Sequence, residues 1–177
     1  MRRHLLEGLI RPPLTEPAPR PDAEAQDELA ATFAHSVRTK LGRSLAIRHV
    51  DAGSCNGCEL ELQALSNPFY DLDRLGLHFV ASPRHADVLT VTGPVTHNMA
   101  EALRRAYDAM PAPKWVIAIG DCAKCGGCFA GSYAIAGGVD AVVPVDLHIP
   151  GCPPDPTTLL QGLLALVEGM STGVGSG

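Results

Sequence analysis

The cysteines carry most of the chemistry that this sequence can perform, and the first two form a CxxC pair. Cys55 and Cys58 lie in the stretch Gly53–Glu59, where glycines flank the thiols and a predicted strand comes just before. This spacing alone fits a redox disulfide, a zinc site or an iron–sulfur site. The other cysteines, which must decide between these sites, are Cys122, Cys125, Cys128 and Cys152.

Length and composition exclude several classes of protein. The chain has 177 residues, 46% hydrophobic composition and a formal net charge of −5. This predicts one domain with a packed core and argues against nucleic acid as a partner. A chain with such a core does not need three disulfides, so metal ligation is the better interpretation of six cysteines in glycine-rich turns. The longest apolar window, Leu159–Val167, is far too short for a membrane span, and we expect membrane association only through partners.

The sequence divides into an arm, a helix, a folded domain and a tail. Residues 1–21 are rich in proline and predict an extended arm, in which His4–Ile10 fits either a short amphipathic turn or a disordered tail. Arg2 and Arg3 resemble a twin-arginine export signal, but Glu7 and the prolines interrupt its apolar segment, so we expect no export signal. Residues 22–42 predict an N-terminal helix, residues 43–169 an α/β domain and residues 170–177 a flexible tail.

Strands and helices alternate along the domain. Apolar and β-branched runs predict strands at 45–50, 77–80, 88–91, 115–119 and 142–145, and helical periodicity predicts helices at 59–65, 98–110 and 156–169. Asn98 and Glu101 fit a capping box at the start of the second helix, and Asp155 with Pro156 fits the start of the third. This alternation predicts a doubly wound, flavodoxin-like α/β fold with a mostly parallel sheet. The cysteine loops follow predicted strands, so they meet at the carboxyl edge of the sheet, where such folds place their sites.

Two sets of four thiols compete as ligands of a shared metal site. The first set is Cys55, Cys58, Cys122 and Cys152, and the second is Cys122, Cys125, Cys128 and Cys152, which has ferredoxin-like spacing. Structural zinc sites usually take two close pairs of ligands, which neither set provides. Glycines beside the thiols favour a bulky cluster, because they let the backbone approach the sulfurs. The residues therefore favour a [4Fe–4S] cluster over zinc.

Five motifs, taken in order, resemble one protein family. They are DAGSCNGCE at 51–59, ASPRHAD at 81–87, TGPVT at 92–96, GDC at 120–122 followed by Gly126 and Gly127, and IPGCPP at 149–154. Together they are similar to the 20 kDa subunit of respiratory complex I, over about residues 43–168. That family includes the small subunits of membrane-bound, energy-converting [NiFe] hydrogenases of the formate hydrogenlyase type. The CxxC spacing of Cys55 and Cys58 resembles the hydrogenase branch, because complex I members carry two adjacent cysteines there.

The resemblance implies that Cys55, Cys58, Cys122 and Cys152 ligate a single [4Fe–4S] cluster. It further implies an oxidoreductase subunit that holds the proximal cluster of a [NiFe] hydrogenase and has no complete active site of its own. The partners would be a large subunit with nickel–iron and two terminal CxxC pairs, a ferredoxin-like iron–sulfur subunit and membrane subunits. The chain would sit peripherally on the cytoplasmic side of the inner membrane. The alternatives are a complex I-like subunit whose cluster reduces quinone and, in another class, a structural zinc-binding assembly module.

Several further residues have two possible roles each. Cys125 and Cys128 depart from the family pattern and fit either buried free thiols or additional ligation and redox roles. By resemblance Arg84 and His85 lie near the cluster, although a surface salt bridge explains Arg84 equally well. Glu59 and Glu61 fit a role in proton movement or the ordinary preference for acids at a helix start. The remaining histidines, which we expect to be structural or exposed, are His35, His49, His78, His97 and His148. No GxGxxG, P-loop, nucleophile-elbow or HExxH motif is present.

Overall fold

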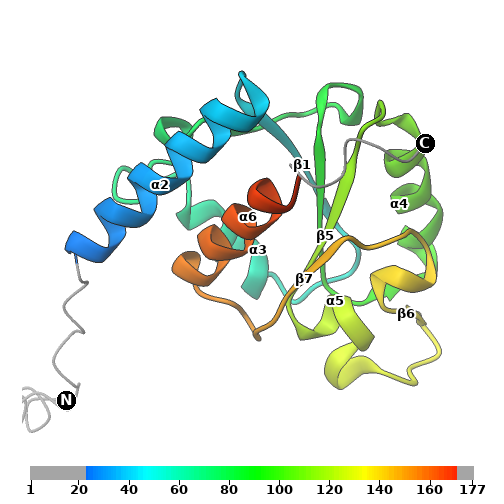
Figure 1. Ribbon diagram of the computed structural model, residues 1–177. Helices are drawn as coiled ribbons and strands as arrows, with labels where there is room; N and C mark the ends of the chain where they lie inside the picture. Colours follow the sequence, from blue (N-terminus) through cyan, green and yellow to red (C-terminus); the bar gives the residue numbers. More distant parts are fainter. Residues whose placement is uncertain (1–22, 171–177) are drawn as a thin grey trace, which may run out of the picture.

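A five-stranded parallel sheet organises the molecule, whose computed structural model describes residues 23–170 (Figure 1). The strands are β1 (Leu45–Asp51), β2 (Leu77–Phe79), β3 (Val88–Thr92), β5 (Trp115–Ile119) and β7 (Leu147–Ile149). They lie in the order β2-β1-β3-β5-β7, and every neighbouring pair is parallel. Numbered among themselves, these strands have the order 2-1-3-4-5, which is that of flavodoxin-like folds. The predicted doubly wound α/β fold is confirmed.

Helices cover both faces of the sheet and bury its strands. The α-helices are α2 (Ala23–Leu41), α3 (Gly57–Ala64), α4 (His97–Ala109), α5 (Asp121–Cys125) and α6 (Pro156–Gly169). The 3-10 helices are η1 (Leu72–Leu75), η2 (Pro83–His85), η3 (Gly127–Phe129) and η4 (Val139–Ala141). One hydrophobic cluster joins α2, α3 and α6 to one face, and a second joins α4 and α5 to the other. Figure 1 shows α6 and α2 together on the near side and α4 on the far right.

The helix ahead of the sheet is part of this core. Phe33 and Val37 of α2 are almost completely buried, and Lys40 Nζ donates a hydrogen bond to the carbonyl oxygen of Glu168 (2.6 Å) near the end of α6. Helix α6 begins as the sequence predicts, since the Asp155 side chain accepts from the Thr158 N–H (2.8 Å). The predicted arm at residues 1–21 lies outside the described residues, as does nearly all of the predicted tail at 170–177.

The start of α4 differs from the predicted capping box. The N-cap is Thr96, whose side chain accepts a hydrogen bond from the Met99 N–H (3.3 Å), so the helix begins one residue earlier, at His97. Thr96 occupies extended backbone because it belongs to the short strand β4 (Val95–Thr96), which pairs antiparallel with β6 (Ile135–Gly137). The prediction was wrong because this pairing brings together segments about 40 residues apart in sequence, which the helical periodicity does not reveal.

The last strand of the sheet also lies further along the chain than predicted. Residues 142–145 follow η4 and carry no strand, and β7 is formed by Leu147–Ile149 instead. Asp146 fixes this register, because its backbone N–H donates to Val116 O (2.9 Å) while its side chain accepts from the Val116 N–H (2.7 Å). Val143 is buried against the second hydrophobic cluster rather than in the sheet. Strand β7 therefore lies immediately before the Cys152 loop.

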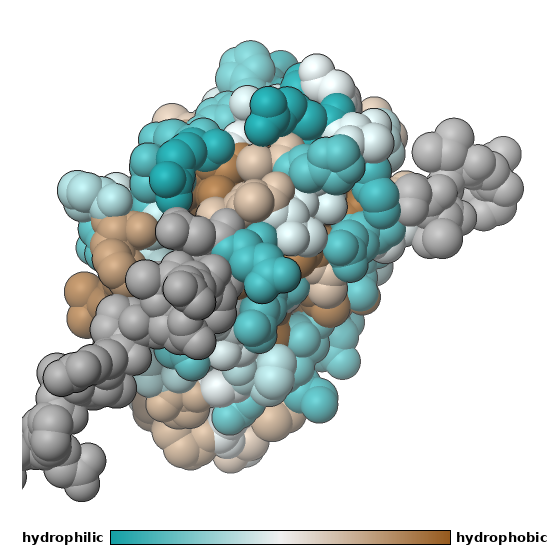
Figure 2. Space-filling model, turned by 60° about the vertical axis from the view of Figure 1, so that its left-hand side comes forward, coloured by the Kyte–Doolittle hydropathy of each residue, from teal (hydrophilic) through white to brown (hydrophobic). Residues whose placement is uncertain are grey.

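No helix within residues 23–170 is long and apolar enough to cross a bilayer. The face shown in Figure 2 carries hydrophilic side chains between separate hydrophobic groups. Large hydrophobic side chains that are exposed are Leu60, Phe69, Phe79, Phe129 and Tyr133.

Candidate metal centre

The CxxC loop is a hydrogen-bonded turn at the carboxyl end of β1. Asp51 Oδ1 accepts from the backbone N–H groups of Gly53 and Ser54, both at 2.8 Å, and Ser54 Oγ accepts from the Asn56 N–H (3.0 Å). Asn56, the N-cap of α3, has a left-handed backbone with φ of 71°. Asparagine tolerates this conformation better than most residues, and it turns the chain so that Cys58 enters the first turn of α3.

The loops after β5 and β7 are joined to each other by hydrogen bonds. The N–H of Gly120 donates to Ile149 O (2.8 Å) and the N–H of Asp121 donates to Gly151 O (2.9 Å). In return, Asp121 Oδ1 accepts from the Gly151 N–H (3.1 Å), and His148 Nε2 donates to Gly120 O (3.1 Å). These bonds hold the segments that carry Cys122 and Cys152 next to each other.

The CxxC loop lies against both of these segments. A Cβ atom placed on Gly120 would stand 2.8 Å from Cys58 Sγ, so the backbone after β5 touches the second thiol of the pair. A Cβ on Gly57 would stand 3.5 Å from Cys55 Sγ and 3.8 Å from Pro153 Cβ, next to Cys152. The three loops therefore converge at the carboxyl edge of the sheet, around its β1–β3 switch point.

The thiols of these loops are close enough to influence one another electrostatically. Burial, followed by the negative charges of Glu59 and the other thiolates, raises the pKa of Cys58 to about 12. Burial and neighbouring thiolates also raise the pKa of Cys122. The thiolates that act on Cys58 are those of Cys55, Cys122 and Cys152. Without a cation nearby, Cys58 and Cys122 resist ionisation, whereas ligation to iron supplies the positive charge that their ionisation needs.

The donor set and the open backbone around it fit a [4Fe–4S] cluster. Among residues 23–170, no three His, Cys, Asp or Glu side chains come together closely enough to hold one metal ion. In a cubane each thiolate binds a different iron, so four thiols surround a volume instead of meeting at one point. Gly120 and Gly127 leave space next to the sulfurs of Cys58 and Cys122, where any Cβ would intrude. These features match the needs of a bulky cluster.

Cys125 and Cys128 occupy different positions relative to this site. Cys125 is exposed, and its Sγ donates to Asp121 O (3.5 Å), within its own helix α5. Cys128 is also exposed, but it follows Gly127, whose backbone lies against the Cys122 sulfur. Its charge adds to the burial and the Cys152 charge that raise the pKa of Cys122. Because both side chains are exposed, neither is the buried, apolar thiol that was one reading of the sequence.

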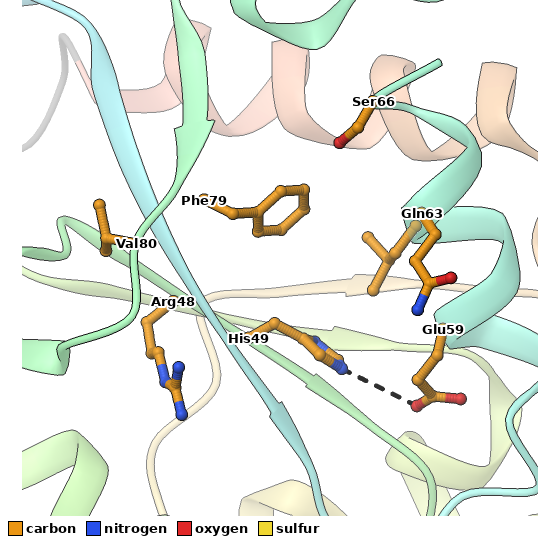
Figure 3. A pocket seen from close by; sticks show the side chains of 8 residues that line it. Arg48, His49, Glu59, Gln63, Ser66, Phe79 and Val80 are labelled. Carbon is orange, nitrogen blue, oxygen red and sulfur yellow. Dashed lines mark ion pairs between the residues drawn. The ribbon is translucent and has the colours of Figure 1, made fainter.

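A buried polar network lies beside Cys58 and opens into a pocket of about 240 Å³. Thr92 donates to Glu59 Oε1, and His49 Nε2 lies 3.9 Å from that oxygen, as the dashed line in Figure 3 shows. His49 Nδ1 lies 3.3 Å from Thr90 Oγ1. Glu59 is 7% exposed, and its Oε2 has no hydrogen-bond partner. Burial lowers the pKa of His49, and the negative charge of Glu59 only partly opposes this shift. The lowered pKa favours the neutral ring.

The sequence did not reveal His49, Thr90 and Thr92 as members of this network. They come together because β1 and β3 pair with His49 opposite Thr90 and Asp51 opposite Thr92. A histidine two residues before an aspartate carries no signature of its own. Strand register, which depends on long-range packing, was the missing information.

Arg84 and His85 lie in η2, on the crossover that leads from β2 into the amino-terminal end of β3. The Ser82 side chain caps this turn by accepting from the Arg84 N–H (3.3 Å). The cysteine loops, in contrast, follow the carboxyl ends of β1, β5 and β7. An effect of Arg84 or His85 on a cluster stays a prediction.

Comparison with known proteins relates the chain to a formate hydrogenlyase subunit and to a chain of a respiratory membrane complex. It is 45% identical over 145 residues to formate hydrogenlyase subunit 7 of Escherichia coli (strain K12), which covers 80% of this chain and 57% of that protein. The chain thus spans little more than half the length of this curated relative. Its fold is similar to a chain in the structure of the membrane-bound sulfane sulfur reductase, an archaeal respiratory membrane complex, with a TM-score of 0.67 and 33% identity. That similarity covers 85% of this chain and 80% of the other.

The family model described as NADH ubiquinone oxidoreductase, 20 Kd subunit, matches residues 55–166. The match begins at Cys55 and extends into α6, so it includes all three cysteine loops. It confirms the resemblance carried by the five sequence motifs. The chain belongs to the family of the 20 kDa subunit of NADH ubiquinone oxidoreductase.

Proposed function

We propose that this chain is the electron-transfer small subunit of a membrane-bound [NiFe] hydrogenase complex. It holds one [4Fe–4S] cluster, the proximal one, through Cys55, Cys58, Cys122 and Cys152. The observation that carries the proposal is the convergence of the three loops bearing these thiols at one edge of the sheet. When bound, the cluster accepts and donates single electrons, and it exchanges them with a nickel–iron site in a separate large subunit.

The protein contributes a hydrogen-bonded frame for these ligands. The hydrogen bonds between Asp121 and Gly151 fix the distance between two of the loops. The turn capped by Asp51 fixes the third. Cys58 is half-buried behind this frame, so it is partly shielded from solvent, while Cys55 and Cys152 are exposed. Exposed ligands at the edge give a partner subunit a short path for electrons.

Two observations favour a hydrogenase over other members of the family. The CxxC spacing of Cys55 and Cys58 resembles the hydrogenase branch. The 45% identity to formate hydrogenlyase subunit 7 covers 80% of the chain. This assignment implies three kinds of partner, which are a large subunit, a ferredoxin-like iron–sulfur subunit and membrane subunits. It also implies that this chain is peripheral, on the cytoplasmic side of the membrane.

A second candidate is a complex I-like subunit whose cluster reduces quinone. The family description, which names a ubiquinone oxidoreductase, favours it. Both candidates would place a cluster on the same four thiols, so the presence of a cluster on this chain does not separate them. The identity of the metal in the large subunit does.

Purification of the intact complex through a tag on this chain tests the assignment. We expect a co-purifying large subunit that contains nickel and two terminal CxxC pairs, together with hydrogen uptake or evolution by the complex. A large subunit without nickel and without those pairs would overturn the hydrogenase assignment and favour the quinone reductase. Zinc in place of iron and sulfide on this chain would instead identify a structural assembly module.

A further inference from the structure

The chain folds back around the sulfur of Cys122 immediately after α5. Gly126 and Gly127 both have left-handed backbones, with φ of 86° and 54°. A Cβ atom on Gly127 would stand only 2.6 Å from Cys122 Sγ and 3.1 Å from Cys122 Cα. Cys128 is the next residue, so its backbone follows directly on this contact with Cys122. This turn places a fifth cysteine one residue away from the backbone that touches a thiol of the candidate cluster site.

The side chain of Cys128 is exposed, and it belongs to a turn that contains two adjacent glycines. Glycines allow such a turn to change conformation at low steric cost. Cys125 provides a contrast within the same segment, because its thiol hydrogen-bonds to Asp121 O in the preceding helical turn. Cys152 provides a second contrast with Cys122, because two prolines follow it and residues 153–177 contain no cysteine.

We propose that Cys128 is a fifth thiol of the cluster site, able to bind the iron that Cys122 binds. This inference rests on the proposed function, because it requires an iron–sulfur cluster at the three loops. The exchange needs no oxidant or reductant. With a cluster bound, the Cys128 thiol would lose its proton and bind the iron, Cys122 would release the same iron, and the Cys122 thiolate would take up a proton.

Iron and sulfide content of the full chain in its complex, purified without oxygen, tests the proposal. The variants are Cys122→Ala, Cys122→Ala/Cys128→Ala, Cys122→Ala/Cys125→Ala and Cys152→Ala. We expect Cys122→Ala and Cys122→Ala/Cys125→Ala to keep most of the iron, with shifted g-values in the EPR spectrum of the reduced protein. Cys122→Ala/Cys128→Ala and Cys152→Ala should lose most of it.

Equal iron loss in Cys122→Ala and in Cys122→Ala/Cys128→Ala would overturn the proposal. Iron retention that depended on Cys125 and not on Cys128 would overturn it as well. The wild-type protein separates this inference from the proposed function. Wild type without iron contradicts the cluster itself, whereas loaded wild type with an empty Cys122→Ala variant contradicts only the role of Cys128.

A second measurement keeps Cys122 in place and so avoids any folding defect of its variants. The rate of iron loss to an excess of the chelator bathophenanthroline disulfonate is compared for wild type, Cys128→Ala and Cys125→Ala. A fifth thiol recaptures iron that Cys122 releases, so Cys128→Ala should lose iron several-fold faster than wild type. Cys125→Ala should match wild type. Equal rates for the two variants would contradict the proposal.

Discussion

Gly120 lies directly against the sulfur of Cys58, and a Cβ at position 120 would stand 2.8 Å from that Sγ atom. This contact joins the loop after β5 to the CxxC pair after β1. Gly120 also has φ of 86°, a conformation that side chains rarely adopt, and its N–H is bonded to Ile149 O at the end of β7. One glycine therefore couples the three cysteine-bearing segments.

Replacing Gly120 should damage the cluster site more than it damages the fold. Gly120→Ala inserts a methyl group beside Cys58 Sγ and displaces this thiol, so we expect most of the bound iron to be lost. Gly131→Ala is the matched control, because Gly131 also has positive φ (80°) but has open space where the Cβ would lie. Both variants carry backbone strain of about 1–3 kcal/mol, and Gly120→Ala carries more of it, because ψ of 160° places Gly120 in a region that is essentially restricted to glycine. Iron analysis alongside thermal unfolding separates the two effects, and equal iron content in the variants would contradict the expected clash.

His49 should make the stability of the protein depend on pH below neutrality. Burial lowers the pKa of His49 in the folded state below its ordinary value of 6.5, with Glu59 and Asp51 opposing this shift and Arg48 adding to it. The unfolded state therefore binds a proton first as the pH falls. The stabilisation by neutral His49 is complete above pH 6.5 and declines as the pH falls towards the lowered pKa, by at most about 1.4 kcal/mol per pH unit.

His49→Gln removes this titration and leaves a polar group in the network. Urea unfolding of wild type and variant between pH 5 and pH 8 measures the difference. We expect the free energy of unfolding of the wild type to fall more steeply below pH 6.5 than that of the variant. Parallel curves for the two proteins would show that His49 titrates alike in the folded and unfolded states.

The contact between α6 and β7 should be sensitive to a single added methyl group. A Cβ on Gly162 would stand 2.6 Å from Cγ1 of Ile149, which is 2% exposed and cannot move aside. Gly162→Ala should therefore lower the free energy of unfolding by about 1–3 kcal/mol. Gly169→Ala, in the last turn of the same helix, has nothing within 4 Å of the new Cβ and should raise it by up to about 1 kcal/mol. Thermal unfolding of both variants checks this prediction, and destabilisation of similar size in both would contradict it.

The sequence predicted the features that depend on local pattern. The buried strand β5 is a continuous apolar run, β3 is rich in β-branched residues, and Asp155 with Pro156 starts α6 as expected. The convergence of the cysteine loops followed from one topological rule, since the carboxyl ends of parallel strands meet at one edge of a sheet. The convergence of these loops therefore depends on the strand order and not on side-chain packing.

The features that were missed depend on contacts distant in sequence. The position of β7 is set by hydrogen bonds between Asp146 and Val116, and the cap of α4 belongs to a strand paired with residues 135–137. The network around Glu59 depends on the register between β1 and β3. The different surroundings of Cys125 and Cys128 depend on the turn at Gly126 and Gly127, whereas their x₂ spacing made them look equivalent.

Iron and sulfide content, together with low-temperature EPR, of Cys55→Ala and Cys125→Ala tests the ligand set most directly. With one [4Fe–4S] cluster on Cys55, Cys58, Cys122 and Cys152, we predict that Cys55→Ala loses the cluster and its EPR signal. Cys125→Ala should keep about four irons per chain and the wild-type spectrum. A cluster retained in Cys55→Ala and lost in Cys125→Ala would contradict this set and place the site on the ferredoxin-like cysteines instead.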